Sequence, residues 1–182
     1  MGNNLVITND GSHSIYNPKI NETYHSKHGA IVEAEHVFIK NGFKAVNKKE
    51  LSILEVGFGT GLNALLTAQQ AESKKVKVDY HTMELYPVNK ESYVQLNFTD
   101  LIGLEKETLL ELHNCKWEEK EEISEYFTLT KNEISLEEYQ TNVKFDVIYF
   151  DAFSPEKQPE LWNYVIFKKM YQFLKEDGFL VT

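Results

Sequence analysis

The chain has 182 residues, of which 42% are hydrophobic and 13% aromatic, and this fits one globular domain with a buried core. Its formal net charge is −9, its 19 basic residues are all lysine, and it has one cysteine, Cys115. These numbers exclude an internal disulfide framework and a Cys-rich zinc site, and the charge does not indicate a nucleic-acid partner.

The N-terminal segment, residues 1–9, has no signal-peptide pattern, and no apolar run is long enough to cross a bilayer. We therefore expect a cytoplasmic protein. After it, Ala30, Ala34, Val37 and Phe38 recur at helical spacing and Gly42 follows as a stop, so residues 29–41 are predicted to form an amphipathic helix.

A glycine-dense turn follows the apolar run of residues 51–56 and leads directly into a helix-forming segment, residues 62–71. Gly57, Gly59 and Gly61 can adopt positive φ, and the first turn of the helix offers free N–H groups to a ligand. The turn therefore predicts an adenosine-bearing ligand. The dinucleotide pattern G-x-G-x-x-G needs a small residue where Leu62 stands, which disfavours a nicotinamide oxidoreductase.

The next predicted strand covers residues 78–85 and carries Glu84 near its end, 84 − 61 = 23 positions after Gly61. An acid at about 20 residues from such a turn commonly accepts hydrogen bonds from a ribose diol. The alternative is an ordinary acid at the end of a strand, in contact with water. We favour the ribose role because Glu84 coincides with the glycine turn.

The acidic charge concentrates in residues 105–140, which hold eleven glutamates against four lysines, 4 − 11 = −7. Within this region, residues 116–125 are predicted to be a solvated helical face or a surface insertion. A weak third strand is expected at residues 127–130, ending near Asn132 and Glu133.

Asp151 follows the buried-type run of residues 145–150, so it should emerge from a strand into a cleft. There it can hold an amine, accept a proton or cap the turn at Ser154 and Pro155, and the sequence alone leaves these roles open.

A final helix is predicted with Pro159 in its first turn and one apolar stripe, and a strand at residues 178–181 follows it. The stripe consists of Trp162, Val165, Ile166, Met170, Phe173 and Leu174. Strands that alternate with helices indicate an α/β fold with a mostly parallel sheet, covered by helices on both faces.

Five separated blocks of the chain are informative when taken together: Asp10-Gly11-Ser12, residues 24–30, residues 53–63, residues 150–155 and residues 159–162. Their combination, spread between residues 8 and 182, resembles the MnmC-like methyltransferases that act on the tRNA wobble uridine. The resemblance implies a class I Rossmann-like methyltransferase fold, S-adenosylmethionine as donor, and methylation of the aminomethyl group of the uridine to give methylaminomethyl-thiouridine.

The resemblance also implies roles for individual residues. Glu55, Gly57, Gly59 and Gly61 would hold the methionine end of the donor, Glu84 its ribose and Glu133 its adenine, although the family more often has Gly-Asp at Asn132-Glu133. Asp151 would act as the catalytic residue that orients the amine. The substrate-binding residues would be Tyr24, His25, Phe153, Ser154 and Pro155.

The resemblance implies tRNA as partner, together with a separate FAD-dependent oxidoreductase. Residues 1–182 are expected to form a single methyltransferase domain, with a leader at 1–50 and a core at 51–182 that lacks the last two strands of the fold. His25 and His28 are spaced as two metal ligands could be, but no cysteine or third histidine stands at ligand spacing from them. No metal site is therefore predicted. Two alternatives stay open: a methyltransferase for a small amine or a protein, and a non-catalytic S-adenosylmethionine-binding module.

Overall fold

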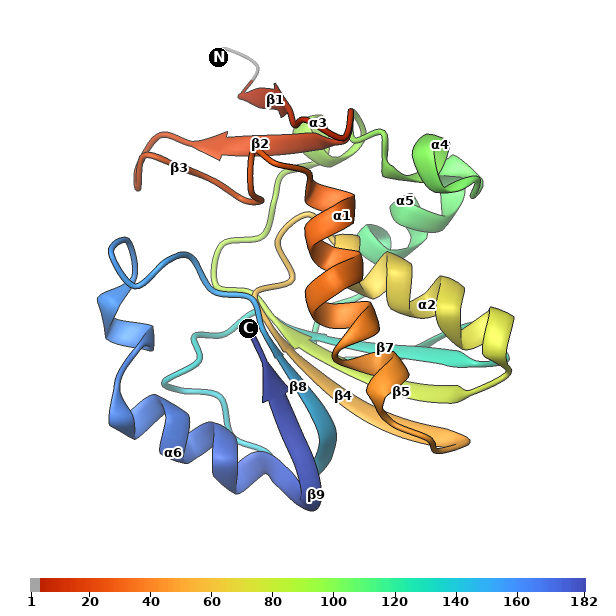
Figure 1. Cartoon of the computed structure of the whole chain (residues 1–182), viewed down its shortest axis with the longest axis vertical. Coiled ribbons are helices and arrows are strands. Elements are labelled where there is room, and N and C mark those ends of the chain that lie inside the picture. The colour runs from red at the N-terminus through yellow and green to blue at the C-terminus, as the bar shows by residue number, and fades with distance from the viewer. Residues whose placement is uncertain (1–3) are drawn as a thin grey trace.

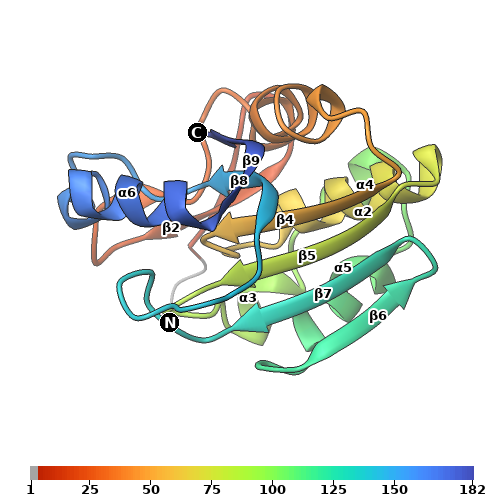
Figure 2. The ribbon, with the colours of Figure 1, turned by 90° about the horizontal axis from the view of Figure 1, so that it is seen from below.

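A central sheet of six strands organises the computed structural model, which describes residues 4–182 (Figures 1 and 2). The strand order is β6-β7-β5-β4-β8-β9, and every neighbouring pair is parallel except β6 with β7. The strands are β4 (Glu50–Val56), β5 (Lys77–Met83), β6 (Lys120–Ser124), β7 (Phe127–Asn132), β8 (Phe145–Phe150) and β9 (Leu174–Val181). The predicted mostly parallel sheet is confirmed.

Helices cover both faces of this sheet, as the two perpendicular views show (Figures 1 and 2). The first face carries α1, α2 and α5, and the opposite face carries α6. The helices are α1 (Ala30–Ala34), α2 (Leu62–Lys74), α3 (Lys90–Tyr93), α4 (Phe98–Ile102), α5 (Lys106–Asn114) and α6 (Tyr164–Phe173), with a π-helical turn at Glu35–Lys40 and 3-10 turns at Phe43–Ala45 and Pro159–Leu161.

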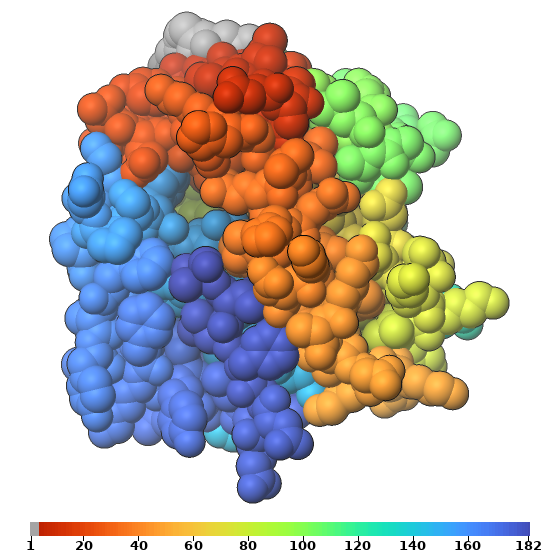
Figure 3. Space-filling model, in the orientation of Figure 1, coloured from red at the N-terminus to blue at the C-terminus, as the bar shows by residue number. Residues whose placement is uncertain are grey.

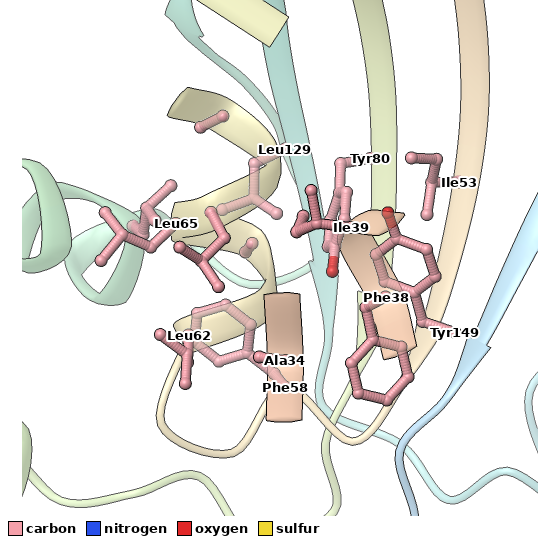
Figure 4. Packing of buried hydrophobic residues seen from close by; sticks show 14 of the residues in the cluster. Ala34, Phe38, Ile39, Ile53, Phe58, Leu62, Leu65, Tyr80, Leu129 and Tyr149 are labelled. Atoms are coloured by element: carbon pink, nitrogen blue, oxygen red, sulfur yellow. The ribbon is translucent and has the colours of Figure 1, made fainter. Parts of the chain in front are cut away.

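Successive side chains of the central strands point to opposite faces of the sheet, and this gives the molecule two separate hydrophobic cores. Ile53 of β4 and Tyr149 of β8 pack against α1 and α2, whereas Leu54 and Phe150 point to the other face and pack against α6. Figure 4 shows the first core from close by, with Tyr149 beside residues of the π-helical turn. Since both faces of the sheet are buried, β4 and β8 are mostly apolar, whereas β5 alternates apolar and polar residues.

The first described residues form a small antiparallel sheet that the sequence analysis did not predict. It consists of β1 (Leu5–Ile7), β2 (His13–Asn17) and β3 (Glu22–Thr23), in that order. It lies at the end of the molecule where the glycine turn is found, and Figure 3 shows the surface hollowed between this sheet and the C-terminal residues drawn in blue. The expectation for residues 1–9 falls partly on residues 1–3, which lie outside the described residues.

Three local predictions were wrong. Pro159 does not start the last helix but opens a separate 3-10 turn, because Asn163 caps α6 by accepting from the N–H groups of Val165 and Ile166. Val165 is 71% exposed, so it does not belong to the buried stripe. For residues 116–125 the helical face was wrong, because Lys120–Ser124 form the antiparallel edge strand β6, which pairs with β7; the surface insertion, the other half of that prediction, is not contradicted. Among residues 4–182, no helix is long and apolar enough to span a membrane.

Candidate functional site

The carboxyl ends of β4, β5 and β8 meet at one edge of the sheet. The N–H of Gly57 donates to the carbonyl of Met83 (3.0 Å), and the N–H of Asp151 donates to the carbonyl of Val56 (3.1 Å). The chain runs from β4 to β5 on one side and reaches β8 on the other, so this is the topological switch point where open α/β sheets bind ligands. A cleft of about 550 Å³ opens there.

The glycine turn forms the floor of this cleft. Gly57, Gly59 and Gly61 all have positive φ, 91°, 49° and 76°, which favours glycine at each position. A Cβ on Gly57 would lie 2.7 Å from the carbonyl oxygen of Asp151, and one on Gly59 would lie 3.0 Å from the ring of Tyr24. The first two glycines are therefore required by close contacts inside the protein, and not only by room for a ligand.

Glu84 follows β5 and faces the turn. Its Oε2 accepts from the N–H of Gly59 (3.0 Å) and its Oε1 accepts from the N–H of Tyr86 (2.9 Å). A carboxylate has about four acceptor positions. Glu84 therefore keeps acceptor capacity for the two hydroxyls of a ribose while its orientation is fixed by the backbone. Burial and the negative charge of Glu84 together raise the pKa of the Tyr24 phenol to about 12, so the phenol is neutral.

Asp151 follows β8 and lines the same cleft. The side-chain amide of Asn63, in the first turn of α2, donates to Asp151 Oδ2 (2.8 Å). Burial raises the pKa of the Asp151 carboxyl to about 7, although the hydrogen bond from Asn63 acts in the opposite direction. The carboxyl therefore changes its charge near neutral pH, which suits a group that accepts and releases a proton.

Glu55 lies beneath the turn and does not line the cleft. It is 1% exposed, and its Oε2 accepts from the hydroxyl of Thr82 (2.8 Å). Within residues 4–182 its Oε1 has no hydrogen-bond partner. Burial raises the pKa of Glu55 well above its ordinary value, which favours the neutral form of this carboxyl. Its predicted contact with a donor molecule stays a prediction.

The N-terminal sheet and the loop after β8 close the outer rim. The rings of Tyr24 and Phe153 meet edge to face with centroids 5.2 Å apart, and the hydroxyl of Ser154 donates to Glu22 Oε2 (3.0 Å). The indole N–H of Trp162 donates to the carbonyl of Phe153 (2.8 Å). The first two of these contacts join the leader to the Asp-Ala-Phe-Ser-Pro segment at the rim of the cleft.

The structure brings most of the predicted site residues to the cleft. Its lining includes Tyr24, His25, Gly57, Gly59, Glu84, Asp151 and Phe153. Other predicted residues lie apart from the lining: Gly61 caps α2, Ser154 bonds to Glu22, and Pro155 and Glu133 are exposed. The segment after Glu133, residues 134–137, lines the cleft in its place.

Asn63, Leu85 and Tyr86 are cleft residues that the sequence analysis did not select. The position of Asn63 in the first helical turn after the glycines is a signal that points to it, since that turn faces the ligand in such folds. Leu85 and Tyr86 directly follow Glu84, and both are largely exposed. Among the described residues, no group of three or more His, Cys, Asp or Glu is placed to hold a metal ion.

Residues 104–182 match a family model described as S-adenosyl-L-methionine-dependent methyltransferase. The tRNA 5-methylaminomethyl-2-thiouridine biosynthesis bifunctional protein MnmC of Cupriavidus metallidurans is 26% identical over 97% of this chain, and that of Leptospira interrogans is 28% identical over 90%. The crystal structure of MNMC2 from Aquifex aeolicus superposes with a TM-score of 0.78 at 27% identity, over all of this chain.

These relatives are longer than the chain. The chain spans 28% of the length of both bifunctional proteins and 59% of the Aquifex chain. The similarity over the whole described fold supports a class I, Rossmann-like methyltransferase architecture.

Proposed function

We propose that the chain is a member of the MnmC-like family of S-adenosylmethionine-dependent methyltransferases and that it methylates the aminomethyl group of a tRNA wobble uridine. The observation that carries the proposal is the placement of Asp151 in the same cleft as the glycine turn and Glu84. A donor-binding half and a proton-accepting half thus face one another across the carboxyl edge of the sheet.

The donor half has residues that fit S-adenosylmethionine. Glu84 retains acceptor positions for the ribose hydroxyls, and the backbone of residues 57–61 presents an open, side-chain-poor surface beside it. When bound, S-adenosylmethionine supplies a methyl group on a positively charged sulfur. The protein then has to align the acceptor nitrogen with that methyl group and receive a proton.

Asp151 is the residue we assign to that second task. Asn63 occupies its Oδ2 and fixes the plane of the carboxylate, which leaves Oδ1 for the hydrogen of an amine. In its ionised form, Asp151 orients the neutral amine and stabilises the positive charge that develops on nitrogen. It also accepts the proton after methyl transfer, because its pKa of about 7 allows exchange with water at neutral pH.

The charge of the cleft favours an amine as acceptor. Its lining contains Glu84, Glu137, Asp151 and Glu160 but, among the described residues, one lysine, Lys19. Negative charge attracts an ammonium from solution, which must release a proton to water before its nitrogen can attack the methyl group, and it disfavours a phosphate inside the cleft. The phosphates of a tRNA would then lie outside the cleft and contact lysines of the surface.

A second function, methylation of a small amine or of a protein, is favoured by the overall charge. The chain carries −9 and has no arginine, whereas RNA-binding surfaces are usually rich in both basic residues. In this alternative the same cleft and the same Asp151 would act on another amine.

Two measurements separate these functions. Isothermal titration with S-adenosylmethionine tests the donor half, and the absence of binding would contradict both methyltransferase proposals. Mass spectrometry of nucleosides from aminomethyl-bearing tRNA, incubated with the protein and donor, tests the acceptor. We expect the wobble nucleoside to gain one methyl group. Donor binding without this gain would favour the second function or a non-catalytic S-adenosylmethionine-binding module.

A further inference from the structure

Thr60, the residue between Gly59 and Gly61, is held from two sides by two histidines. His25 Nε2 lies 2.7 Å from Thr60 Oγ1, and His113 Nε2 lies 3.0 Å from the carbonyl oxygen of Thr60. His25 comes from the leader and His113 from the last turn of α5, 35 and 53 positions away along the chain. Thr60 itself is 1% exposed.

The protonation of both histidines is determined by their surroundings. A carbonyl oxygen only accepts, so His113 Nε2 must carry the hydrogen and donate it to Thr60. Burial lowers the pKa of His25 and of His113 to about 4 each. Both rings are therefore neutral at neutral pH, and their bonds to Thr60 do not depend on a charge.

Each histidine ring is held in its place by neighbours. His113 stacks on Tyr93 with ring centroids 4.1 Å apart and planes at 9°, and its carbonyl accepts from the buried Lys131 Nζ (2.7 Å). The His25 ring contacts Phe98 edge to face at 5.9 Å. The two rings are thus rigid supports that cannot easily move away from Thr60.

The N–H groups of Gly57, Phe58, Gly59 and Gly61 are each bonded within the protein, and the two histidines add the contacts that hold Thr60. Gly59 and Gly61 both adopt left-handed conformations, with φ of 49° and 76°, and a chain with two glycines loses much conformational entropy when it is ordered. A ligand that binds a mobile loop must order it and binds more weakly by that amount. Holding Thr60 orders the loop before the ligand arrives.

We infer that His25 and His113 are positioning residues that preorganise the glycine turn for the donor through the hydroxyl and the carbonyl of Thr60, respectively. His25 is then a support of the donor loop rather than a contact for the acceptor, and it couples the leader to donor binding. This inference rests on the proposed donor site, but the order that the two histidines give to the loop can also be measured without any ligand.

The test uses titration of S-adenosylhomocysteine into variants of the full chain. We expect H25L and H113L each to weaken binding about tenfold, which corresponds to about 1.4 kcal/mol. H113Q should recover most of the affinity, because its amide offers an N–H near the position of Nε2. T60V removes only the hydroxyl, so H25L should cost nothing further in that background, whereas H113L should still cost about tenfold.

The controls are H28L and H36L, which replace exposed histidines outside the loop and should bind as the wild type does. Hydrogen exchange of the amides of residues 57–63 is measured on the same proteins without ligand. Exchange should be faster in H25L and H113L than in the wild type and in the controls, even if the wild type does not bind the probe, an outcome that would contradict the proposed function alone.

Three results would overturn the inference. The first is unchanged exchange in H25L and H113L, the second is binding within twofold of the wild type, and the third is an H25L effect of full size in the T60V background. If H113L does not fold, as circular dichroism would reveal, the H25L and T60V pair decides the question.

Discussion

At the scale of single residues, Asp151 combines a cost to the fold with a role in the proposed chemistry. Its carboxyl sits in a poorly solvated cleft that disfavours the ionised form, and the reaction needs that form. Active sites commonly keep such groups at the expense of stability. Replacing Asp151 by a neutral residue should therefore raise the stability of the fold and lower the activity.

We predict that D151N lowers turnover at least 100-fold, because the amide neither accepts the proton nor stabilises the developing charge. The affinity for S-adenosylmethionine should stay within about twofold. At pH 8 the variant should be more stable to denaturant by about 1–2 kcal/mol, because it removes a buried ionised group. Full turnover with unchanged donor binding would remove Asp151 from the reaction.

The pH dependence follows from the raised pKa of Asp151. Turnover at saturating donor and acceptor should rise with pH through about 7 and then level off, because the ionised form is the active one. The free energy of unfolding should fall as the pH rises, in contrast to the turnover. Between about pH 4 and 7 the folded state binds a proton that the unfolded state has lost, so this group makes the protein less stable as the pH rises.

The pH profile of D151N provides the matched comparison, since the acceptor amine titrates in both proteins. The step near pH 7 in turnover and the corresponding part of the stability profile should both be absent from D151N. A wild-type profile that overlays that of the variant after scaling would contradict the assignment.

Glu55 tests whether an ionised carboxylate is needed beneath the turn, because burial raises its pKa well above the ordinary value and favours the neutral form. Glutamine has the same shape and is also neutral, so E55Q should change stability by less than about 1 kcal/mol and donor affinity by less than about threefold. Titration of the donor and chemical denaturation measure both. A large loss of affinity would show that an ionised Glu55 contacts the donor.

At the scale of elements, the leader is attached to α1 through Asp10. Its Oδ2 accepts from the N–H of Val32 (3.0 Å), and its Oδ1 accepts from the N–H and hydroxyl of Ser12 and from the hydroxyl of Thr8. Burial tends to raise the pKa of Asp10, but these bonds outweigh it and lower the pKa to about 2. The side chain thus does for α1 what a helix cap does, from a distant part of the chain.

D10A should therefore lower the free energy of unfolding by about 1–2 kcal/mol, the usual cost of losing a cap and its hydrogen bonds. E176A, which removes an exposed carboxylate from β9, is the control and should change it by less than about 0.5 kcal/mol. Urea denaturation at pH 7 measures both. Equal stability of D10A and the wild type would mean that the leader is not held by this residue.

At the scale of the whole molecule, the sheet could be predicted because apolar runs and helical spacing are local signals. The two acids that follow β5 and β8, Glu84 and Asp151, were found for the same reason, since they come directly after such runs. The small sheet β1–β3 was not predicted, because its strands are short and are stabilised by distant contacts such as the bond from His13 N–H to Asn97 Oδ1 (2.8 Å).

Distant contacts also explain what was missed in the site. The roles of Asn63, His25 and His113 depend on partners 88, 35 and 53 positions away, and no periodic pattern records such pairs. Residues 116–125 were misread because an edge strand rich in charge has the same composition as a solvated helical face. The expected absence of two further strands stays a prediction.

The central claim is that one cleft joins the donor site at the glycine turn to Asp151. The most direct measurement is a crystal structure of the protein with S-adenosylhomocysteine. We predict that the ribose hydroxyls contact Glu84 and that the sulfur faces Asp151 across the cleft. A ligand bound with its ribose away from Glu84, or with its sulfur turned away from Asp151, would contradict the account.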